Sequence, residues 1–266
     1  MAGTKSRKPT VEIVKRWIKA GYGQGQGSSY KPFMNVRDVP SIGASNMVTS
    51  RITGRNHHYL SRQEFKTHLL AEYSRSTLDI REQFALLPWD ETQSIAKNLG
   101  IRHPHFPGTS TPTVLTTDLV LSFKRPDGIE LVAVSVKLTK HLTPRNLEKL
   151  LIERVYWNRR GIRWVLATET NIPNVRARNL QFFEAALNDR RGAQSGIDPT
   201  HFSRKFEEHH AAHLSFNEIM TKTIQDIGVD IQVGHTLLGR AVWERTSRID
   251  INATPLSHRS AVILTV

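Results

Sequence analysis

Two β-rich runs joined by a turn tetrapeptide constrain the fold more than any other feature of this 266-residue chain. Residues 114–124 (VLTTDLVLSFK) and 129–138 (IELVAVSVKL) flank RPDG, which has the composition of a tight turn. This pattern predicts an antiparallel hairpin in which Lys124 lies opposite Ile129. Asp118 then lies opposite Ser135, and Lys137 shares their face two residues further on. A carboxylate and an ammonium group therefore converge on one face of the hairpin.

Short motifs before and after the hairpin predict the elements that surround it. Ser61 and Glu64 have the spacing of a helix capping box, and the run 78–88 that follows is typical of a strand. Thr143-Pro144 opens an amphipathic helix, and 161–168 is typical of a buried strand. The order α-β-β-β-α-β predicts an α/β domain. We also expect a helix over 10–20, an irregular stretch over 89–112, and an apolar side of the later helix formed by Leu147, Leu150, Leu151 and Val155.

The pair formed by Asp118 and Lys137 has two interpretations. A lone Asp–Lys pair on a sheet is usually a surface ion pair that contributes little to stability. On a hairpin followed by a helix and a strand, however, it resembles the restriction-endonuclease-like PD-(D/E)xK core, in which carboxylates hold Mg²⁺ and the lysine orients a water molecule. Ser135 stands where that motif has its second carboxylate, so Glu64 is the natural donor in this topology. Glu64 also has a purely structural explanation as a capping residue.

The charge of the chain favours a polyanionic partner. Its 37 Lys and Arg outnumber its 24 Asp and Glu, which gives a net charge of +13. Residues 1–60 hold ten of the basic residues and two of the acidic ones, although a basic tail without a partner would show the same bias. We expect this segment to grip DNA phosphates, with contacts from Lys15, Arg16, Arg51, Arg55 and His57, the last of which has packing as its alternative role.

Several stretches together resemble the TnsA family, the endonuclease subunits of cut-and-paste transposons that encode a heteromeric transposase. The resemblance covers most of the first two-thirds of the chain and continues more weakly through 228–244 (GVDIQVGHTLLGRAVWE). The stretches that carry it are TGRNHHYLSRQE (53–64), LDIREQFALLP (78–88), IRHP (101–104), TTDLVL (116–121), VSVK (134–137), LEKLLIERVYW (147–157) and GIRWVLATE (161–169).

The resemblance implies a catalytic site and a set of partners. The family's catalytic Glu, metal-binding Asp and Lys fall on Glu64, Asp118 and Lys137. Where the family commonly has Gln this chain has Ser135, whose backbone carbonyl can still bind Mg²⁺, or Mn²⁺ in its place. The family cuts double-stranded DNA at the 5′ ends of the transposon, beside a partner transposase (TnsB) and an ATPase regulator (TnsC). The alternative is a catalytically silent DNA-binding or adaptor protein on the same scaffold.

The last third of the chain has a different character. We expect a nuclease domain over 1–171 and a winged-helix-like domain over 172–266, with helices followed by strands at 248–254 and 260–266. This domain has eleven basic and ten acidic residues, a balance that favours a protein partner over DNA and agrees with docking of the ATPase regulator. Leu237, Leu238 and Trp243 are candidate contacts, or else core residues. Without Cys, a secretory signal or an apolar run long enough to span a bilayer, the chain is expected in the cytoplasm, without a membrane partner.

Overall fold

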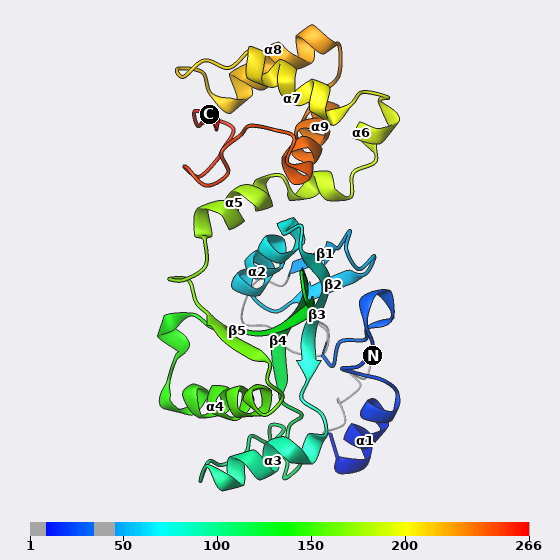
Figure 1. Cartoon of the computed structure of the whole chain (residues 1–266), viewed down its shortest axis with the longest axis vertical. Helices are drawn as coiled ribbons and strands as arrows, with labels where there is room; N and C mark the ends of the chain where they lie inside the picture. Colours follow the sequence, from blue (N-terminus) through cyan, green and yellow to red (C-terminus); the bar gives the residue numbers. More distant parts are fainter. Residues whose placement is uncertain (1–8, 35–45, 266) are drawn as a thin grey trace, which may run out of the picture. The chain divides into compact units, whose positions relative to one another are not determined.

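The computed structural model describes residues 9–34 and 46–265, which form two compact units (Figure 1). The first unit comprises the chain up to Val48, Ile52–Phe65 and Ser76–Asn171. The second comprises Ile172 to the C-terminus together with two earlier segments, Thr49–Arg51 and Lys66–Arg75, which the sequence interpretation assigned to the first domain. Four of the basic residues counted in the N-terminal excess lie outside the described residues: Lys5, Arg7, Lys8 and Arg37.

A four-stranded sheet with the order β3-β4-β5-β6 forms the centre of the first unit. The strands are β3 (Thr77–Ala85), β4 (Thr116–Arg125), β5 (Gly128–Val136) and β6 (Arg163–Ala167). The predicted hairpin register is confirmed, because Lys124 lies opposite Ile129 and Leu119 opposite Val134. β6 pairs in parallel with β5, which requires the helical crossover that the sequence predicts between them. The expected α/β class is therefore confirmed.

Helices cover this sheet largely where the sequence places them. They are α1 (Val11–Lys19), capped by Thr10, α3 (Trp89–Asn98) and α4 (Pro144–Asn158), whereas α2 (Arg62–Tyr73) begins in the first unit and continues into the segment of the second unit that starts at Lys66. The expectation of an irregular stretch over 89–112 is wrong in part, because α3 occupies its beginning. α3 and α4 share a core with the sheet that includes Ile95, Val120, Ala133, Ile152 and Trp157.

The expected apolar side of α4 is also wrong in part. Leu147 and Leu151 are 47% and 41% exposed, whereas Leu150, Ile152 and Trp157 are buried. The buried face includes Tyr156 and Trp157 at the end of the helix, because these two aromatic side chains bury more apolar area than the leucines would. A second, two-stranded sheet, β1 (Asn46–Thr49) and β2 (Asn56–Tyr59), precedes α2.

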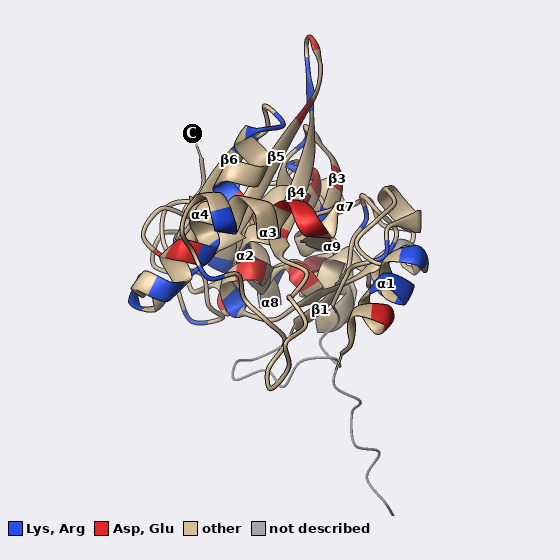
Figure 2. Cartoon of the chain, turned by 90° about the horizontal axis from the view of Figure 1, so that it is seen from below, with Lys and Arg blue, Asp and Glu red and all other residues tan. Residues whose placement is uncertain are grey.

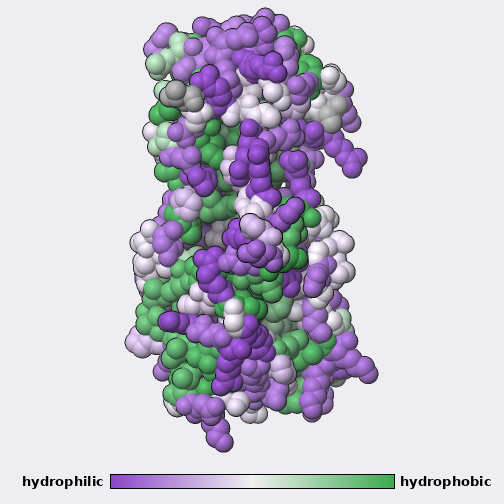
Figure 3. All heavy atoms as spheres, viewed as in Figure 1, coloured by the Kyte–Doolittle hydropathy of each residue, from purple (hydrophilic) through white to green (hydrophobic). Residues whose placement is uncertain are grey.

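The second unit is helical in the residues that are described. It contains α5 (Asn174–Phe182), α6 (Arg191–Gln194), α7 (Pro199–Glu208), α8 (Phe216–Ile227) and α9 (Ile231–Glu244). The predicted capping box of Ser215 and Glu218 begins α8, and Gly228 ends it in the left-handed conformation. The visible surface over α7 and α8 is mainly hydrophilic (Figure 3). None of the described helices combines the length and apolar character that a membrane crossing needs.

Two expectations for this unit change. Up to residue 265 the segments at 248–254 and 260–266 form no regular strands, although they lie side by side through a bridge between Ile249 and Leu264 and a backbone hydrogen bond from Asp250 to Ile263. Pro255 and a series of turns interrupt the regular pairing that a wing needs. Leu237, Leu238 and Trp243 are 0%, 0% and 8% exposed, so they form the core and are not available for docking. The winged-helix assignment stays a prediction.

Candidate active site

Asp118 and Lys137 converge as the hairpin register predicts. Asp118 lies on β4, and Lys137 directly follows β5. The Lys137 Nζ atom lies 3.8 Å from Asp118 Oδ2, and the same oxygen accepts a 2.6 Å hydrogen bond from the backbone N–H of Val136. The Asp118 carboxylate raises the pKa of Lys137 above its usual value, with a smaller contribution from Glu64. Lys137 is therefore a fixed positive charge beside the carboxylate.

Glu64 lies in the first turn of α2 and acts as a cap. Its carboxylate accepts hydrogen bonds from the Leu60 N–H at 3.1 Å and from the Ser61 hydroxyl at 2.8 Å. The side chain is buried, and burial followed by the negative charge of Asp118 raises the pKa of Glu64 to about 7. The capping explanation is therefore correct but incomplete, because a cap has no need to lie close to a second carboxylate.

A third carboxylate, Glu153 on α4, lies behind these residues and was not predicted from the sequence. It is buried and accepts hydrogen bonds from the hydroxyls of Thr117 on β4, at 2.6 Å, and Ser135 on β5. The indole N–H of Trp157 donates to Thr117, and that of Trp164 donates to Ser135. Burial, followed by the charge of Asp118, raises the pKa of Glu153 to about 7.

The sequence did contain a signal for Glu153. Leu150, Tyr156 and Trp157 mark the buried face of α4, and Glu153 falls in the same helical phase, three or four residues from each of them. A carboxylate on the apolar face of a helix usually has a specific role, because burying it requires compensating hydrogen bonds.

The residues at this site fit a divalent cation held partly by the substrate. Among the described residues, no three His, Asp or Glu side chains are gathered closely enough to hold a metal ion by themselves. The carboxyl groups of Glu64 and Asp118 remain, and a negative charge on one disfavours a negative charge on the other. The backbone carbonyl of Ser135 lies on the strand next to Asp118. Mg²⁺ is commonly bound in this way, by one or two carboxylates completed by water and substrate phosphates.

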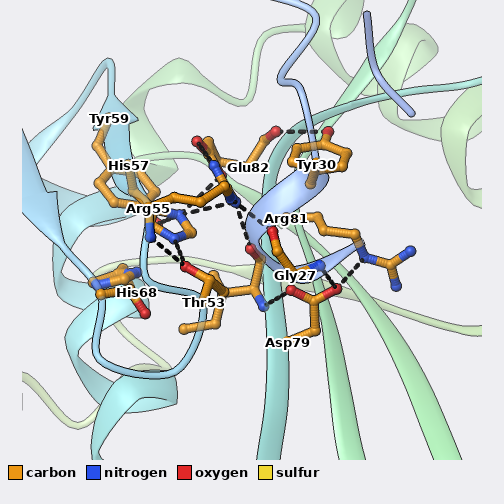
Figure 4. A network of polar contacts seen from close by, with 12 residues as sticks. Gly27, Tyr30, Thr53, Arg55, His57, Tyr59, His68, Asp79, Arg81 and Glu82 are labelled. Carbon is orange, nitrogen blue, oxygen red and sulfur yellow. Dashed lines mark hydrogen bonds and ion pairs between the residues drawn. The ribbon is translucent and has the colours of Figure 1, made fainter. Parts of the chain in front are cut away.

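The predicted DNA contacts divide into two groups. Lys15 and Arg16 lie exposed on α1, whose ribbon carries more basic than acidic positions (Figure 2). Arg51 belongs to the second unit and is 46% exposed. The side chains of Arg55 and His57 are 9% and 0% exposed and both contact Glu82, so their predicted role as phosphate contacts is disfavoured (Figure 4). A phosphate could reach them only after that buried ion pair was broken, so packing is the better explanation.

Comparisons with known proteins identify the family of this chain. The family model described as "TnsA-like endonuclease N terminal" matches residues 74–169, which include Asp118, Lys137 and Glu153. The transposon Tn7 transposition protein TnsA of Escherichia coli is 36% identical over 239 residues, which cover 89% of this chain and 84% of that protein. The similarity therefore runs through both units and extends well beyond the segment matched by the family model. On this identity and coverage, the chain belongs to the TnsA family.

Proposed function

We infer that the chain is the endonuclease subunit of a heteromeric transposase, and we propose that it hydrolyses phosphodiester bonds at the 5′ ends of a transposon. The single observation that carries this proposal is the contact between Asp118 and Lys137, whose charges also act on the buried Glu64 in the first turn of α2. The name of the Escherichia coli relative, a Tn7 transposition protein, supplies the biological setting.

We propose that Glu64, Asp118 and the backbone carbonyl of Ser135 hold Mg²⁺, for which Mn²⁺ can substitute. When bound, the cation supplies Lewis-acid activation of the phosphate and of the attacking water. Lys137 remains protonated because its pKa is raised, so its Nζ atom orients water and offsets phosphate charge without acting as a base.

Glu153 supports this site from behind. By accepting hydrogen bonds from Thr117 and Ser135, it fixes the two strands that carry Asp118 and the Ser135 carbonyl. A catalytically silent scaffold would gain nothing from burying Glu64 and Glu153 near Asp118, because each buried carboxylate near another costs stability. This cost favours the enzyme over the silent adaptor.

The two units suggest a division of labour. We propose that Lys15 and Arg16 on α1, with Arg51, contact phosphates of double-stranded transposon-end DNA. We further propose that the helical second unit, with a winged-helix-like arrangement, docks the ATPase regulator TnsC, while the partner transposase TnsB cuts and joins the 3′ ends. The near balance of charge over 172–266 supports a protein partner for that unit.

A strand-specific cleavage assay tests the proposal. Transposon-end DNA labelled on each strand is incubated with the chain and the partner transposase, with Mg²⁺, Mn²⁺ or a chelator. The expected result is a 5′-end cut that requires this chain and either cation. A 5′-end cut that persists in the chelator, or that the partner transposase makes alone, would contradict the proposal.

A further inference from the structure

A cluster of buried charged side chains lies in the first unit, apart from the groups assigned to the metal site. Glu82 on β3 is fully buried, and its carboxylate pairs with Arg55 through both oxygens, at 2.9 and 2.8 Å (Figure 4). His57 Nδ1 lies 2.8 Å from the same carboxylate. Burial alone would raise the pKa of Glu82, but the hydrogen bonds from His57 and Arg55 outweigh it and hold that pKa at about 2. The carboxylate is therefore ionised at any working pH.

This cluster is connected to Glu64 through the end of β2. His57 and Tyr59 alternate to the same face of the strand, and their rings stack with centroids 6.1 Å apart and planes at 10°. The Tyr59 ring in turn contacts Phe65, next to Glu64 on α2, with centroids 6.3 Å apart. The residue after Tyr59 is Leu60, whose N–H donates to the Glu64 carboxylate. Fixing His57 therefore fixes both the cap and the helix turn that hold Glu64.

The same cluster holds the glycine-rich loop that follows α1, residues 21–30. Arg55 Nε donates to the Gly27 carbonyl at 3.0 Å, and the Gly27 N–H donates to Asp79 at 3.2 Å. The Tyr30 hydroxyl donates to the backbone carbonyl of Glu82 at 2.9 Å. Both backbone groups of Gly27 are thus held by side chains of β3 and the turn before β2. The loop, which leads back to the basic helix α1, and the cap of Glu64 share one set of anchors.

We propose that Glu82, with Arg55 and His57, is a positioning cluster that sets the place of Glu64 at the metal site and couples it to the glycine-rich loop after α1. The proposal rests on the proposed metal role of Glu64. A cluster that served stability alone would not need to end on the cap of Glu64. Outer residues that orient a metal ligand typically contribute 10- to 100-fold to metal affinity, on the order expected for Glu82.

The test compares Glu82→Gln with Glu91→Gln in the full chain. Glu91 controls for the loss of a carboxylate that pairs with an arginine through both oxygens, here Arg160 at 2.9 and 2.6 Å; it lies on α3 with 21% side-chain exposure, and none of its hydrogen bonds or ion pairs in the described residues leads to Glu64. Mn²⁺ affinity is measured directly by titration, at a temperature where circular dichroism shows each protein folded. We expect about 10- to 100-fold weaker Mn²⁺ binding for Glu82→Gln and unchanged binding for Glu91→Gln. Equal affinities for the two variants would overturn the proposal.

A double variant separates positioning from general loss of stability. Glu64→Gln should itself weaken Mn²⁺ binding, and adding Glu82→Gln to it should cause little further loss, because Glu82 acts through Glu64. Additive losses would overturn the coupling. If Glu64→Gln alone leaves Mn²⁺ binding unchanged, the proposed metal site is wrong whatever Glu82 does.

A milder variant keeps the test valid if Glu82→Gln fails to fold. His57→Phe retains the ring that stacks on Tyr59 and leaves Glu82 paired with Arg55, but it removes the hydrogen bond to Glu82 and the one between His57 Nε2 and the Thr53 hydroxyl. We expect weaker Mn²⁺ binding in the same direction, partly restored by His57→Gln, whose amide can donate to Glu82. Full Mn²⁺ affinity in a folded His57→Phe protein would count against the cluster.

Discussion

Replacing Glu153 by glutamine removes a buried ionisable group while keeping its shape and an oxygen that accepts from Thr117 and Ser135. The pKa of Glu153 rises from 4.5 to about 7 in the folded protein. Below pH 4.5 both the folded and the unfolded states carry the proton, so the raised pKa has no effect there. Between pH 4.5 and 7 the unfolded state releases the proton first, so the free energy of unfolding falls through this window. At about 1.4 kcal/mol for each pKa unit, the full cost above pH 7 is about 3 kcal/mol.

Glu153→Gln lacks this cost, so its stability advantage over the wild type should grow from near zero at pH 4.5 to about 3 kcal/mol at pH 8. The assay is hydrogen exchange of α4 amides by mass spectrometry across that pH range, which reports opening of the first unit by itself. Glu148→Gln is the control, because Glu148 is on the same helix but pairs with Arg145 at a partly exposed position. A stability difference for Glu153→Gln that does not change with pH would show that the pKa of Glu153 is not raised in the folded protein.

Three further predictions concern binding and catalysis. Glu64→Gln should keep the cap and hold stability while lowering cleavage about 100-fold, and retained cleavage would leave Glu64 as a cap only. Lys15→Glu with Arg16→Glu should reduce the slope of log affinity against log salt for DNA by about 2, and an unchanged slope would place the DNA elsewhere. Ile231→Asp and Ile263→Asp, at apolar residues that are 38% and 42% exposed, should each weaken binding of the ATPase regulator about tenfold without changing DNA affinity. Normal regulator binding by both variants would exclude these two positions.

Local patterns explain why much of the site could be predicted from the sequence. Strand alternation and a tight turn fix the hairpin register, and that register brings Lys137 to Asp118. The capping box fixes where α2 begins and therefore where Glu64 lies. These relations span few residues and have one geometric solution each.

The remaining features depend on contacts between residues far apart in the chain. Arg55 lies in a basic segment, so the sequence predicts a phosphate contact. Its pairing with Glu82, 27 residues later in the chain, gives it a structural role that the sequence does not indicate. The segments Thr49–Arg51 and Lys66–Arg75 join the second unit through partners near the C-terminus, including Asn188, Glu244 and Arg245. The spacing of apolar residues within one segment does not predict which distant residues that segment will contact. The irregular pairing of 248–254 with 260–265 shows a different limit, since β-rich composition predicts strands but does not ensure that two paired segments form a regular ladder.

We propose that a cation site built around Asp118 cuts the 5′ strand at the transposon end. The most direct test of this proposal is strand-specific cleavage of labelled transposon-end DNA by the complex with the partner transposase, comparing wild type with Asp118→Ala. We predict that Asp118→Ala abolishes the 5′-strand cut, while cutting of the 3′ strand by the partner and binding of DNA by this chain persist. Undiminished 5′-strand cleavage by purified Asp118→Ala protein would show that Asp118 does not hold the cation that cuts this strand.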